Sequence, residues 1–365
     1  MASKRFNVGI VGYGLSAKIF HIPFVETTPQ LRLHSIVQPR PSEANSAPRD
    51  HAHAKHYTSV EALLADDDVD VVVITTPPDT HLALTQQALE AGKHVLTEKP
   101  FVARAQDADM LMALAEEKQR LICVYQNRRW DADFLTVKHL VDGNVLGRIV
   151  GFDTHFDRYR AAAPTSWKAD LPMARGGGAL FDLGSHLVDQ VYVLFGMPQA
   201  VHGRLVSQRL GKLDTVNPDG FTAELTYPDG MLVRVSASVL SAETAQPRFW
   251  LRGAKGSFRK LGLDPQEDQL KAGAKPTDAG FGHEGTERMR LVLVGADGSI
   301  KEHKVPSLEP LTYRAFYARF AMALQSGKDA DVPVKAGEVR DVLRILEAII
   351  ESAKSAKDVV FGSFN

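Results

Sequence analysis

The sequence predicts an α/β domain on a doubly wound parallel sheet, followed by an α+β domain on a large, mainly antiparallel open sheet. Strand and helix patterns alternate over the first third of the chain, which is typical of parallel sheets. Hairpin-like strands dominate after residue 127. The 365 residues suit about two domains of roughly 150 residues each. We therefore expect one domain over residues 1–127 and a second over residues 128–365.

The parallel sheet is expected to contain five strands joined by helices. The clearest strand contains Val71-Val72-Val73-Ile74, an uncharged run that fits a strand buried on both faces. Residues 38–56 are polar and proline-rich, and we expect them to form a surface loop. The expected strands are 6–11, 31–37, 69–75, 95–97 and 121–125, and the expected helices are 59–65, 80–91 and 105–119.

The second domain is expected to combine antiparallel strands with a few helices. The turns Pro228-Asp229-Gly230 and Ala296-Asp297-Gly298 share the Asp-Gly pair that suits a connection between antiparallel strands. The expected strands are 148–160, 200–207, 220–227, 231–240, 248–252 and 290–294, and the expected helices are 131–141, 179–195, 310–326 and 336–355.

Composition and charge exclude several classes of protein. The formal net charge of −1 provides no general attraction to nucleic acid or to an anionic membrane. The single cysteine, Cys123, rules out an intrachain disulfide and a cysteine-rich zinc site. No apolar run is long enough to span a bilayer, and the N-terminus lacks the features of a secretory signal. We expect a cytoplasmic protein that binds small molecules, with neither nucleic acid nor membrane as a partner.

A glycine-rich turn follows the first expected strand. The segment GYGLSA has the G-x-G-x-x-A pattern. Its first glycine permits a tight turn, its second lets a pyrophosphate approach, and its small last residue lets the helix pack against the strand. This context predicts a Rossmann domain that binds a dinucleotide through Gly12, Tyr13, Gly14, Leu15 and Ser16.

The end of the second strand indicates which dinucleotide is bound. NAD enzymes usually carry a carboxylate there, which accepts hydrogen bonds from the ribose hydroxyls. Here the segment VQPRPS contains no carboxylate, and Arg40 is placed to bind a 2′-phosphate. We therefore predict NADP(H) as the cofactor. The alternative is that Arg40 is an exposed loop arginine without this role.

Two further motifs carry candidate catalytic groups. Lys99 in the EKP segment follows a strand at the sheet edge where functional groups gather, which favours acid–base use. Asp182 and His186 in the DLGSH segment are four residues apart and share a helix face, so the carboxylate can orient the imidazole. Alone, Lys99 also fits an exposed lysine, and Asp-x-x-x-His fits half of a metal site. Because no third ligand is nearby, we expect a proton relay and no metal.

Two polar or glycine-rich segments have less definite roles. Gly176-Gly177-Gly178 precedes the DLGSH helix and is expected to give a flexible approach to the site. His51, His53 and His56 form a histidine-rich stretch that could bind a metal. We expect these histidines to be solvated surface residues, because the sequence shows no ordered partner for them.

Together these motifs resemble the family of glucose–fructose oxidoreductases, inositol dehydrogenases and rhizopine-catabolism proteins. The resemblance covers nearly the whole chain, because the segments GYGLSA, TPPDTH, EKP and DLGSH occur in the family's order. It implies that Lys99, Asp182 and His186 carry the chemistry. The segments NRRW, FDRYR and FHIP resemble the NADP-dependent scyllo-inositol dehydrogenase branch. The expected substrate is therefore an inositol, an inosose or an aldopyranose.

The resemblance also implies roles for residues outside this trio. Thr75, Pro77, His81, Glu98 and Lys99 are expected to line the cofactor, with the alternative that His81 only begins a helix. The strand 148–160 alternates, and the sequence leaves open which of its faces meets the site. The residues expected to face the substrate are Asn127, Arg128, Arg158, Trp167, Asp182 and His186, although Arg128, Arg158 and Trp167 fit structural roles equally well.

Three other functions remain open. A dinucleotide-binding regulator on the same fold need not keep the catalytic trio, and turnover of NADPH distinguishes it from an enzyme. An enzyme acting on a non-sugar diol or carbonyl is the second alternative. A Rossmann methyltransferase ranks last, because the EKP and DLGSH segments have no purpose in it. Proteins of the family commonly assemble through the outer sheet face, so we expect a dimer or tetramer with Phe152 and Phe156 exposed for the contact.

Overall fold

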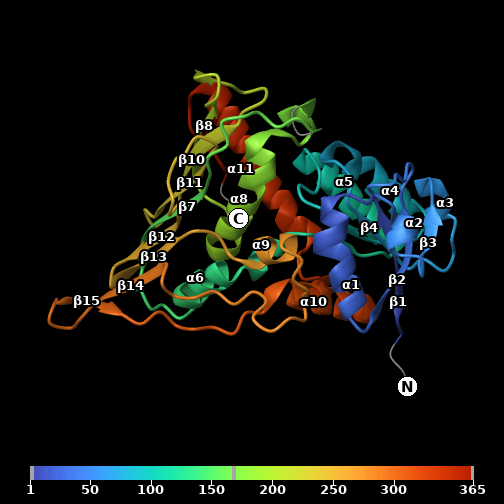
Figure 1. Cartoon of the computed structure of the whole chain (residues 1–365). Coiled ribbons are helices and arrows are strands. Elements are labelled where there is room, and N and C mark those ends of the chain that lie inside the picture. Colours follow the sequence, from blue (N-terminus) through green and yellow to red (C-terminus); the bar gives the residue numbers. More distant parts are fainter. Residues whose placement is uncertain (1–3, 167–169, 363–365) are drawn as a thin grey trace. The chain divides into compact units, whose positions relative to one another are not determined.

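The computed structural model describes residues 4–166 and 170–362, which form two compact units (Figure 1). Unit 1 contains Met1–Trp130, Gln266–Gly282 and Leu311–Arg340. Unit 2 contains Asp131–Pro265, His283–Pro310 and Asp341–Asn365. Each unit therefore combines three stretches of chain. The boundary expected between residues 127 and 128 stays a prediction, because these units follow compactness rather than a single cut.

Unit 1 is built on a six-stranded parallel sheet, which confirms the fold class predicted for the first domain. The strand order is β3-β2-β1-β4-β5-β6, so the chain extends the sheet in both directions from β1. β4 is buried along its whole length, as its lack of charge predicted. The strands are β1 (Phe6–Val11), β2 (Leu31–Val37), β3 (Lys55–Tyr57), β4 (Val71–Ile74), β5 (His94–Thr97) and β6 (Ile122–Val124), and the helices between them are α1 (Ile22–Thr27), α2 (Ala47–Asp50), α3 (Val60–Leu64), α4 (His81–Glu90) and α5 (Ala105–Lys118).

Residues 38–56 contain regular structure, so the prediction of a surface loop is wrong for part of this segment. α2 begins after Ser46, whose hydroxyl accepts a hydrogen bond from the Arg49 amide at 3.4 Å. β3 pairs with β2 at the edge of the sheet. Ala47 and Ala54 are buried. Both elements are too short for their periodicity to be recognised in the sequence.

Two later segments complete unit 1 with α9 (Gln266–Lys271) and α10 (Thr312–Ser326). Tyr317 of α10 stacks on Phe24 of α1, with the ring centroids 5.4 Å apart. Phe316 of α10 meets Tyr125 edge-on, with the centroids 5.0 Å apart. Aromatic pairs in such geometries add about 0.5–1.5 kcal/mol beyond the area they bury. This cluster holds α10 to the first 130 residues of the unit.

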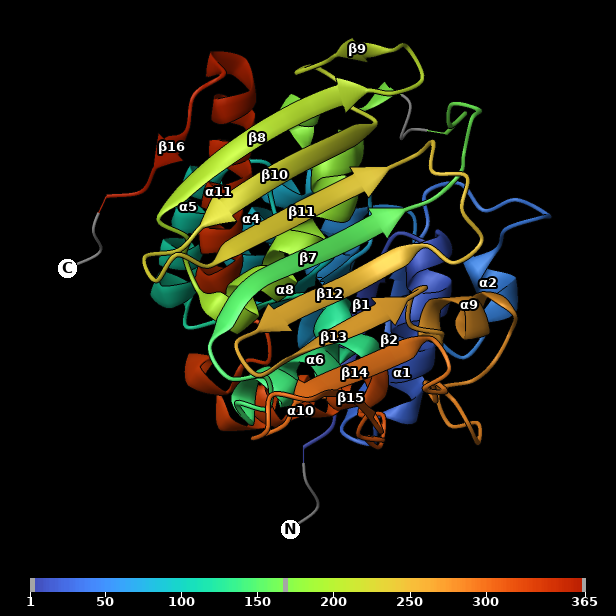
Figure 2. The same cartoon turned by 90° about the vertical axis from the view of Figure 1, so that its left-hand side faces the viewer.

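Unit 2 is built on a ten-stranded sheet, whose strands Figure 2 shows side by side. Among the described strand pairs of this ten-stranded sheet, only β7–β11 is parallel, which confirms the predicted large, mainly antiparallel sheet. The strand order is β15-β14-β13-β12-β7-β11-β10-β8-β16, with β9 beside β8. The strands are β7 (Ile149–Asp157), β8 (Ala200–Ser207), β9 (Lys212–Leu213), β10 (Gly220–Thr226), β11 (Leu232–Ser238), β12 (Pro247–Gly253), β13 (Gly256–Leu261), β14 (Met289–Val294), β15 (Ile300–His303) and β16 (Val359–Val360).

Helices α6 (Ala132–Asp142) and α8 (Ser185–Phe195) lie behind the sheet in Figure 2. Phe152 of β7 faces them, with its ring 5.6 Å from that of Phe249 and 5.8 Å from that of Phe195. Phe152 and Phe156 are both buried, so the prediction that they are exposed for assembly is wrong. The even-numbered residues of β7 therefore face the helices. Its odd-numbered residues, such as His155, face the open side of the sheet.

The helix α11 (Ala336–Ser355) begins in unit 1 and ends in unit 2. Its C-terminal half packs against β8, where the Gly203 amide donates to the Ser352 hydroxyl at 2.9 Å. Within residues 4–166 and 170–362, no helix is both long and apolar enough to cross a membrane.

Candidate active site

The glycine-rich loop after β1 has the geometry of a dinucleotide-binding turn. Gly12 has a φ of +100°, and a Cβ there would lie 2.9 Å from the Thr75 hydroxyl oxygen, so glycine is required. A Cβ on Gly14 would meet no atom within 4 Å, which leaves space for a phosphate group. Ala17 is fully buried. These positions match the steric roles that the G-x-G-x-x-A pattern predicts.

The side chains between the two glycines and the following serine differ in exposure. Tyr13 is buried, and its hydroxyl donates to Asp50 Oδ2 at 2.9 Å, which ties the loop to α2. Leu15 is 61% exposed, so a dinucleotide bound along the loop would cover an apolar side chain. The cofactor contacts expected of both residues stay predictions.

Gln38 occupies the strand-end position where NAD enzymes carry a carboxylate. Its side chain folds into its own loop, where Nε2 donates to the Asn45 carbonyl oxygen at 2.9 Å and Oε1 accepts from the Ala47 amide at 2.7 Å. Gln38 is a neutral amide, so it places no negative charge at the end of β2 that would repel a phosphate group. Arg40 is exposed, and in the described part of the chain its guanidinium forms neither a hydrogen bond nor an ion pair. This arrangement suits an anionic group such as a 2′-phosphate.

Glu98 is the centre of a buried hydrogen-bond network. Its Oε1 accepts from the Ser16 hydroxyl and lies 3.0 Å from His21 Nε2, and its Oε2 accepts from the Lys99 amide at 3.0 Å. The network continues from His21 Nδ1 to the Tyr317 hydroxyl at 2.6 Å. Burial raises the pKa of Glu98, but the contacts with His21, Ser16 and Lys99 lower it by more than burial raises it. The side chain therefore remains a carboxylate.

This network joins the cofactor loop to the strand end that carries Lys99. Ser16 belongs to the loop after β1, whereas Glu98 follows β5. Both were expected to line the cofactor, and the structure shows their side chains bonded to each other. The Tyr317 hydroxyl also lies 3.2 Å from the Phe20 carbonyl oxygen, so this network reaches the residue before His21 as well.

His81 is fully buried at the start of α4, as its structural alternative predicted. Its Nδ1 lies 2.8 Å from the Pro100 carbonyl oxygen, and its Nε2 lies 2.9 Å from the Thr76 carbonyl oxygen. Burial lowers the pKa of the ring. His81 therefore lies between the loop after β4, which contains Thr75 and Pro77, and the loop after β5, and as a neutral ring it donates to one of the two carbonyl oxygens. A direct contact between His81 and the cofactor stays a prediction.

Lys99, Asn127 and Arg128 all lie in unit 1. Asn127 and Arg128 are buried in the turn after β6, whereas Lys99 is partly exposed. Arg128 Nη2 pairs with Glu267 Oε2 at 2.5 Å, and Glu267 Oε1 pairs with Lys271 at 2.5 Å. Burial raises the pKa of Glu267, but the charges of Arg128, Lys271 and Lys99 lower it by more than burial raises it. Glu267 is therefore a carboxylate surrounded by three basic side chains.

Asp182 and His186 lie on one continuous helical segment of unit 2. Residues Leu180–Gly184 form a wide π-helical turn that leads directly into α8. Such turns are rare and occur frequently at functional sites. His186 is buried and Asp182 is partly exposed. The segment keeps the two residues one helical turn apart, which is the arrangement that their spacing predicts.

The other predicted residues of unit 2 are placed as follows. A Cβ on Gly177 would lie 1.9 Å from the Leu171 carbonyl oxygen, so the glycine tract allows two backbone segments to approach closely. The flexibility expected of this tract stays a prediction. Arg158 continues the helix-covered face of β7, and its guanidinium lies 5.9 Å from the Phe156 ring centroid. Trp167 lies outside the described residues.

Sequence reasoning missed three residues of these networks: His21, Tyr317 and Glu267. His21 belongs to the FHIP segment, whose resemblance to one branch of the family was the only available signal. Tyr317 is 296 residues from His21 along the chain, and Glu267 is 139 residues from Arg128. No local pattern links residues at such separations.

Comparison with known proteins assigns the family. A model described as an oxidoreductase family, NAD-binding Rossmann fold, matches residues 6–126. A second, described as an oxidoreductase family, C-terminal alpha/beta domain, matches residues 138–361. The chain belongs to the GFO/IDH/MocA oxidoreductase family. This GFO/IDH/MocA protein is therefore an oxidoreductase with a domain for a nicotinamide dinucleotide, as the motifs predicted.

Individual relatives are similar over nearly the whole chain. An oxidoreductase of Schizosaccharomyces pombe is 38% identical over 372 residues, covering 97% of this chain and 98% of that protein. The Bacillus subtilis scyllo-inositol 2-dehydrogenase (NADP(+)) IolW is 35% identical over 354 residues, covering 97% and 95% respectively. The solved structure of the oxidoreductase yvaA from Bacillus subtilis has a TM-score of 0.88 at 33% identity, covering 98% of this chain and 100% of that one.

Proposed function

We propose that this protein is an NADP-dependent oxidoreductase that transfers a hydride between nicotinamide and a cyclic polyol or sugar, such as an inositol, an inosose or an aldopyranose. The observation that carries the cofactor preference is the end of β2, where Arg40 is exposed and Gln38 provides no carboxylate. The substrate class is supported by the 35% identity to a relative named scyllo-inositol 2-dehydrogenase (NADP(+)).

The proposed chemistry gives each member of the catalytic trio one role. NADP supplies the hydride acceptor at nicotinamide C4. His186 accepts the proton of the substrate hydroxyl, and Asp182 orients the imidazole. Lys99 donates a hydrogen bond to the same oxygen and stabilises the negative charge that develops there. In the alternative assignment Lys99 carries the proton, and coupled titration of the two groups can blur the distinction.

The residues predicted to face the substrate favour a ligand with several hydroxyl groups. Asn127, Arg128, Asp182 and His186 all offer hydrogen-bonding groups. A ligand with several hydroxyl groups can hydrogen-bond to these side chains, whereas an apolar ligand cannot. A non-sugar diol or carbonyl compound is the alternative substrate, and a regulator that binds NADP without turnover is the alternative function.

A substrate panel tests this proposal. NADP reduction is measured with inositols, aldoses and dihydrodiols, and NADPH oxidation with the matching ketones. We expect turnover of at least one inositol or aldose. Activity confined to non-sugar compounds contradicts the substrate class while leaving the trio in place. Tight NADPH binding without any turnover favours the regulator.

Lys99→Met tests the catalytic assignment. We expect kcat to fall more than tenfold while NADPH binding, followed by cofactor fluorescence, persists. Lys118→Met is the matched control, because Lys118 pairs only with its neighbour Glu117 at the end of α5 among its described ion pairs. A Lys99→Met variant that keeps more than a tenth of wild-type kcat contradicts the role, because a tenfold loss is only about 1.4 kcal/mol of barrier.

We also propose that copies of the chain assemble through the open face of the unit 2 sheet. Trp250 is 46% exposed there, and the Arg252 guanidinium lies 4.4 Å from its ring centroid. Sedimentation should show a dimer or tetramer that Trp250→Glu dissociates; a monomeric wild type contradicts this.

The cytoplasmic location and the absence of nucleic-acid and membrane partners stay predictions.

A further inference from the structure

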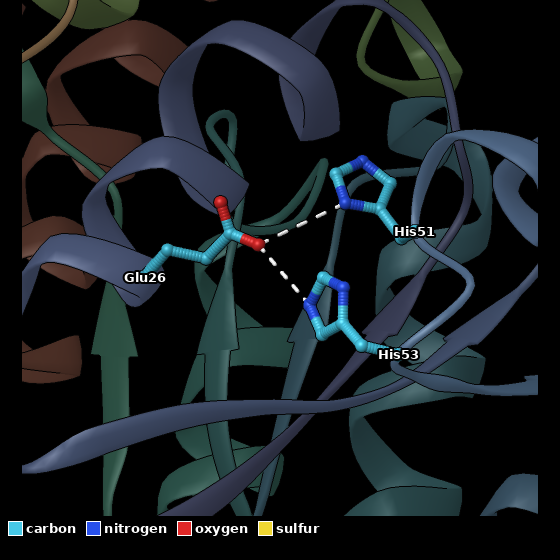
Figure 3. Close-up of side chains that lie close together, drawn as sticks. All are labelled: Glu26, His51 and His53. Atoms are coloured by element: carbon cyan, nitrogen blue, oxygen red, sulfur yellow. Dashed lines mark ion pairs between the residues drawn. The ribbon is translucent and has the colours of Figure 1, made fainter.

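Three potential metal ligands meet on the surface of unit 1. Glu26 lies near the end of α1, and His51 and His53 lie in the turn after α2. Glu26 Oε1 is 3.8 Å from His51 Nδ1 and 3.3 Å from His53 Nε2. Figure 3 shows both rings turning a nitrogen toward this one carboxylate oxygen. The three ligand atoms all lie within 4.8 Å of one another.

These separations fit coordination to a metal better than hydrogen bonding. A hydrogen bond between nitrogen and oxygen spans about 2.7–3.2 Å, so the 3.8 Å contact is too long and the 3.3 Å contact is marginal. Zn²⁺ binds histidine nitrogen and carboxylate oxygen at about 2.0–2.2 Å, which places two ligands of a tetrahedral site about 3.4 Å apart. The two observed distances lie on either side of that value.

The cluster is also accessible from solvent. The side chains of Glu26 and His53 are 39% and 60% exposed, so an ion can enter from solvent.

A second cluster in the same unit provides a contrast. His34, Asp66 and Asp68 also bring ligand atoms together. There, however, Lys55 Nζ lies 3.0 Å from Asp66 and 3.4 Å from Asp68. An ammonium group therefore already compensates this second cluster, whereas the described ion pairs of Glu26 are those with its two histidines.

We propose that Glu26, His51 and His53 bind a divalent transition-metal ion of the Zn²⁺ class, with water completing a tetrahedral site. Two imidazoles and one carboxylate suit Zn²⁺, whereas Mg²⁺ and Ca²⁺ prefer oxygen ligands. The ion ties the end of α1 to the turn after α2. This tether adjoins the cofactor loop, because the His51 ring meets the Tyr13 ring edge-on with the centroids 5.7 Å apart.

Calorimetric titration of the full, chelator-treated chain with ZnCl₂ tests the site. We expect one equivalent of Zn²⁺ per chain and no binding of Mg²⁺. His53→Ala and Glu26→Gln should each weaken Zn²⁺ binding more than tenfold. His303→Ala is the matched control, because it removes an exposed histidine of β15 outside the cluster. Without metal, the variants should melt like the wild type, because both substituted side chains of the cluster are exposed.

Two further measurements separate this site from nonspecific binding. Co²⁺ in the wild type should give the strong visible absorption of a tetrahedral site, and His53→Ala should abolish it. Zn²⁺ should raise the melting temperature of the wild type and leave that of His53→Ala unchanged. The proposal is overturned if the wild type fails to bind Zn²⁺, if His53→Ala binds equally well, or if Asp68→Asn is the variant that loses binding.

Discussion

Replacing Glu98 by glutamine should destabilise unit 1 by about 3 kcal/mol. The substitution keeps the size of the side chain and removes its charge. The carboxylate accepts from three donors, which are the Ser16 hydroxyl, His21 Nε2 and the Lys99 amide. Hydrogen bonds to a charged group contribute about 1.5–3 kcal/mol and neutral ones about 0.5–1.5 kcal/mol, so each conversion costs about 1 kcal/mol.

This loss should be coupled to Tyr317, because the charge on Glu98 acts through His21. A carboxylate facing His21 Nε2 polarises the ring and so strengthens the contact between Nδ1 and the Tyr317 hydroxyl at 2.6 Å. Tyr317→Phe alone leaves His21 Nδ1 buried without its partner hydroxyl, at a cost of about 1–3 kcal/mol. Once Glu98 is neutral, that hydroxyl contributes less. The double variant should therefore lose less than the sum of the single variants, by about 0.5 kcal/mol or more.

Hydrogen exchange of the amides in β1, β4 and β5 measures these free energies. It reports on unit 1 alone, which matters because a chain with two units need not unfold in one step. Tyr192→Phe is a control from unit 2, where that hydroxyl donates to Asp341 at 3.0 Å, and it should leave unit 1 unaffected. Additive losses, within about 0.3 kcal/mol, would refute a shared chain of hydrogen bonds.

Three other substitutions test separate parts of the molecule. Arg40→Ala should weaken NADPH binding roughly 10- to 100-fold and leave NADH binding nearly unchanged, because one charge-assisted contact contributes about 1.5–3 kcal/mol. Fluorescence titration measures both affinities. A wild type that binds NADH as tightly as NADPH contradicts the NADP preference. Arg248→Met should destabilise unit 2 by about 3–5 kcal/mol in denaturant unfolding, since the buried Asp133 carboxylate loses the guanidinium 3.3 Å away; an unchanged midpoint contradicts this. Asp66→Asn should reduce stability at neutral pH, because burial raises the pKa of Asp66 but hydrogen bonds, first from His34, lower it further. That contribution is full above the unfolded pKa of about 3.9 and is lost as the pH falls through the folded pKa, so melting curves should show the difference shrinking with acid; a difference independent of pH contradicts the assignment.

Elements with long, regular patterns were predictable, whereas short or exposed ones were not. β1 and β2 begin and end at the predicted residues, because buried parallel strands are apolar runs bounded by turns. β13 contains Arg259 and Lys260, and β15 is exposed along its length, so neither shows a clear alternation. Packing, rather than local pattern, places these strands in the sheet.

The candidate site divides in the same way. Gly12 and Gly14 could be assigned roles from a six-residue motif, because their function is local and steric. The partners of Glu98 and Arg128 could not, since they come from distant segments. The faces of β7 were also undecided, because alternation separates two faces without saying which is covered. Only the packing of Phe152 against α8 decides that.

The way the two units share the chain limits how this protein can be cut or recombined. The chain passes between the units after residues 130, 265, 282, 310 and 340. A fragment that stops near residue 130 would lack α10. Phe24 would then lose its contact with the Tyr317 ring, and Tyr125 its contact with the Phe316 ring, so both side chains would be exposed to water. Grafting this nicotinamide module onto another protein therefore requires moving three segments together, and a single crossover in the gene would leave both halves without part of their cores.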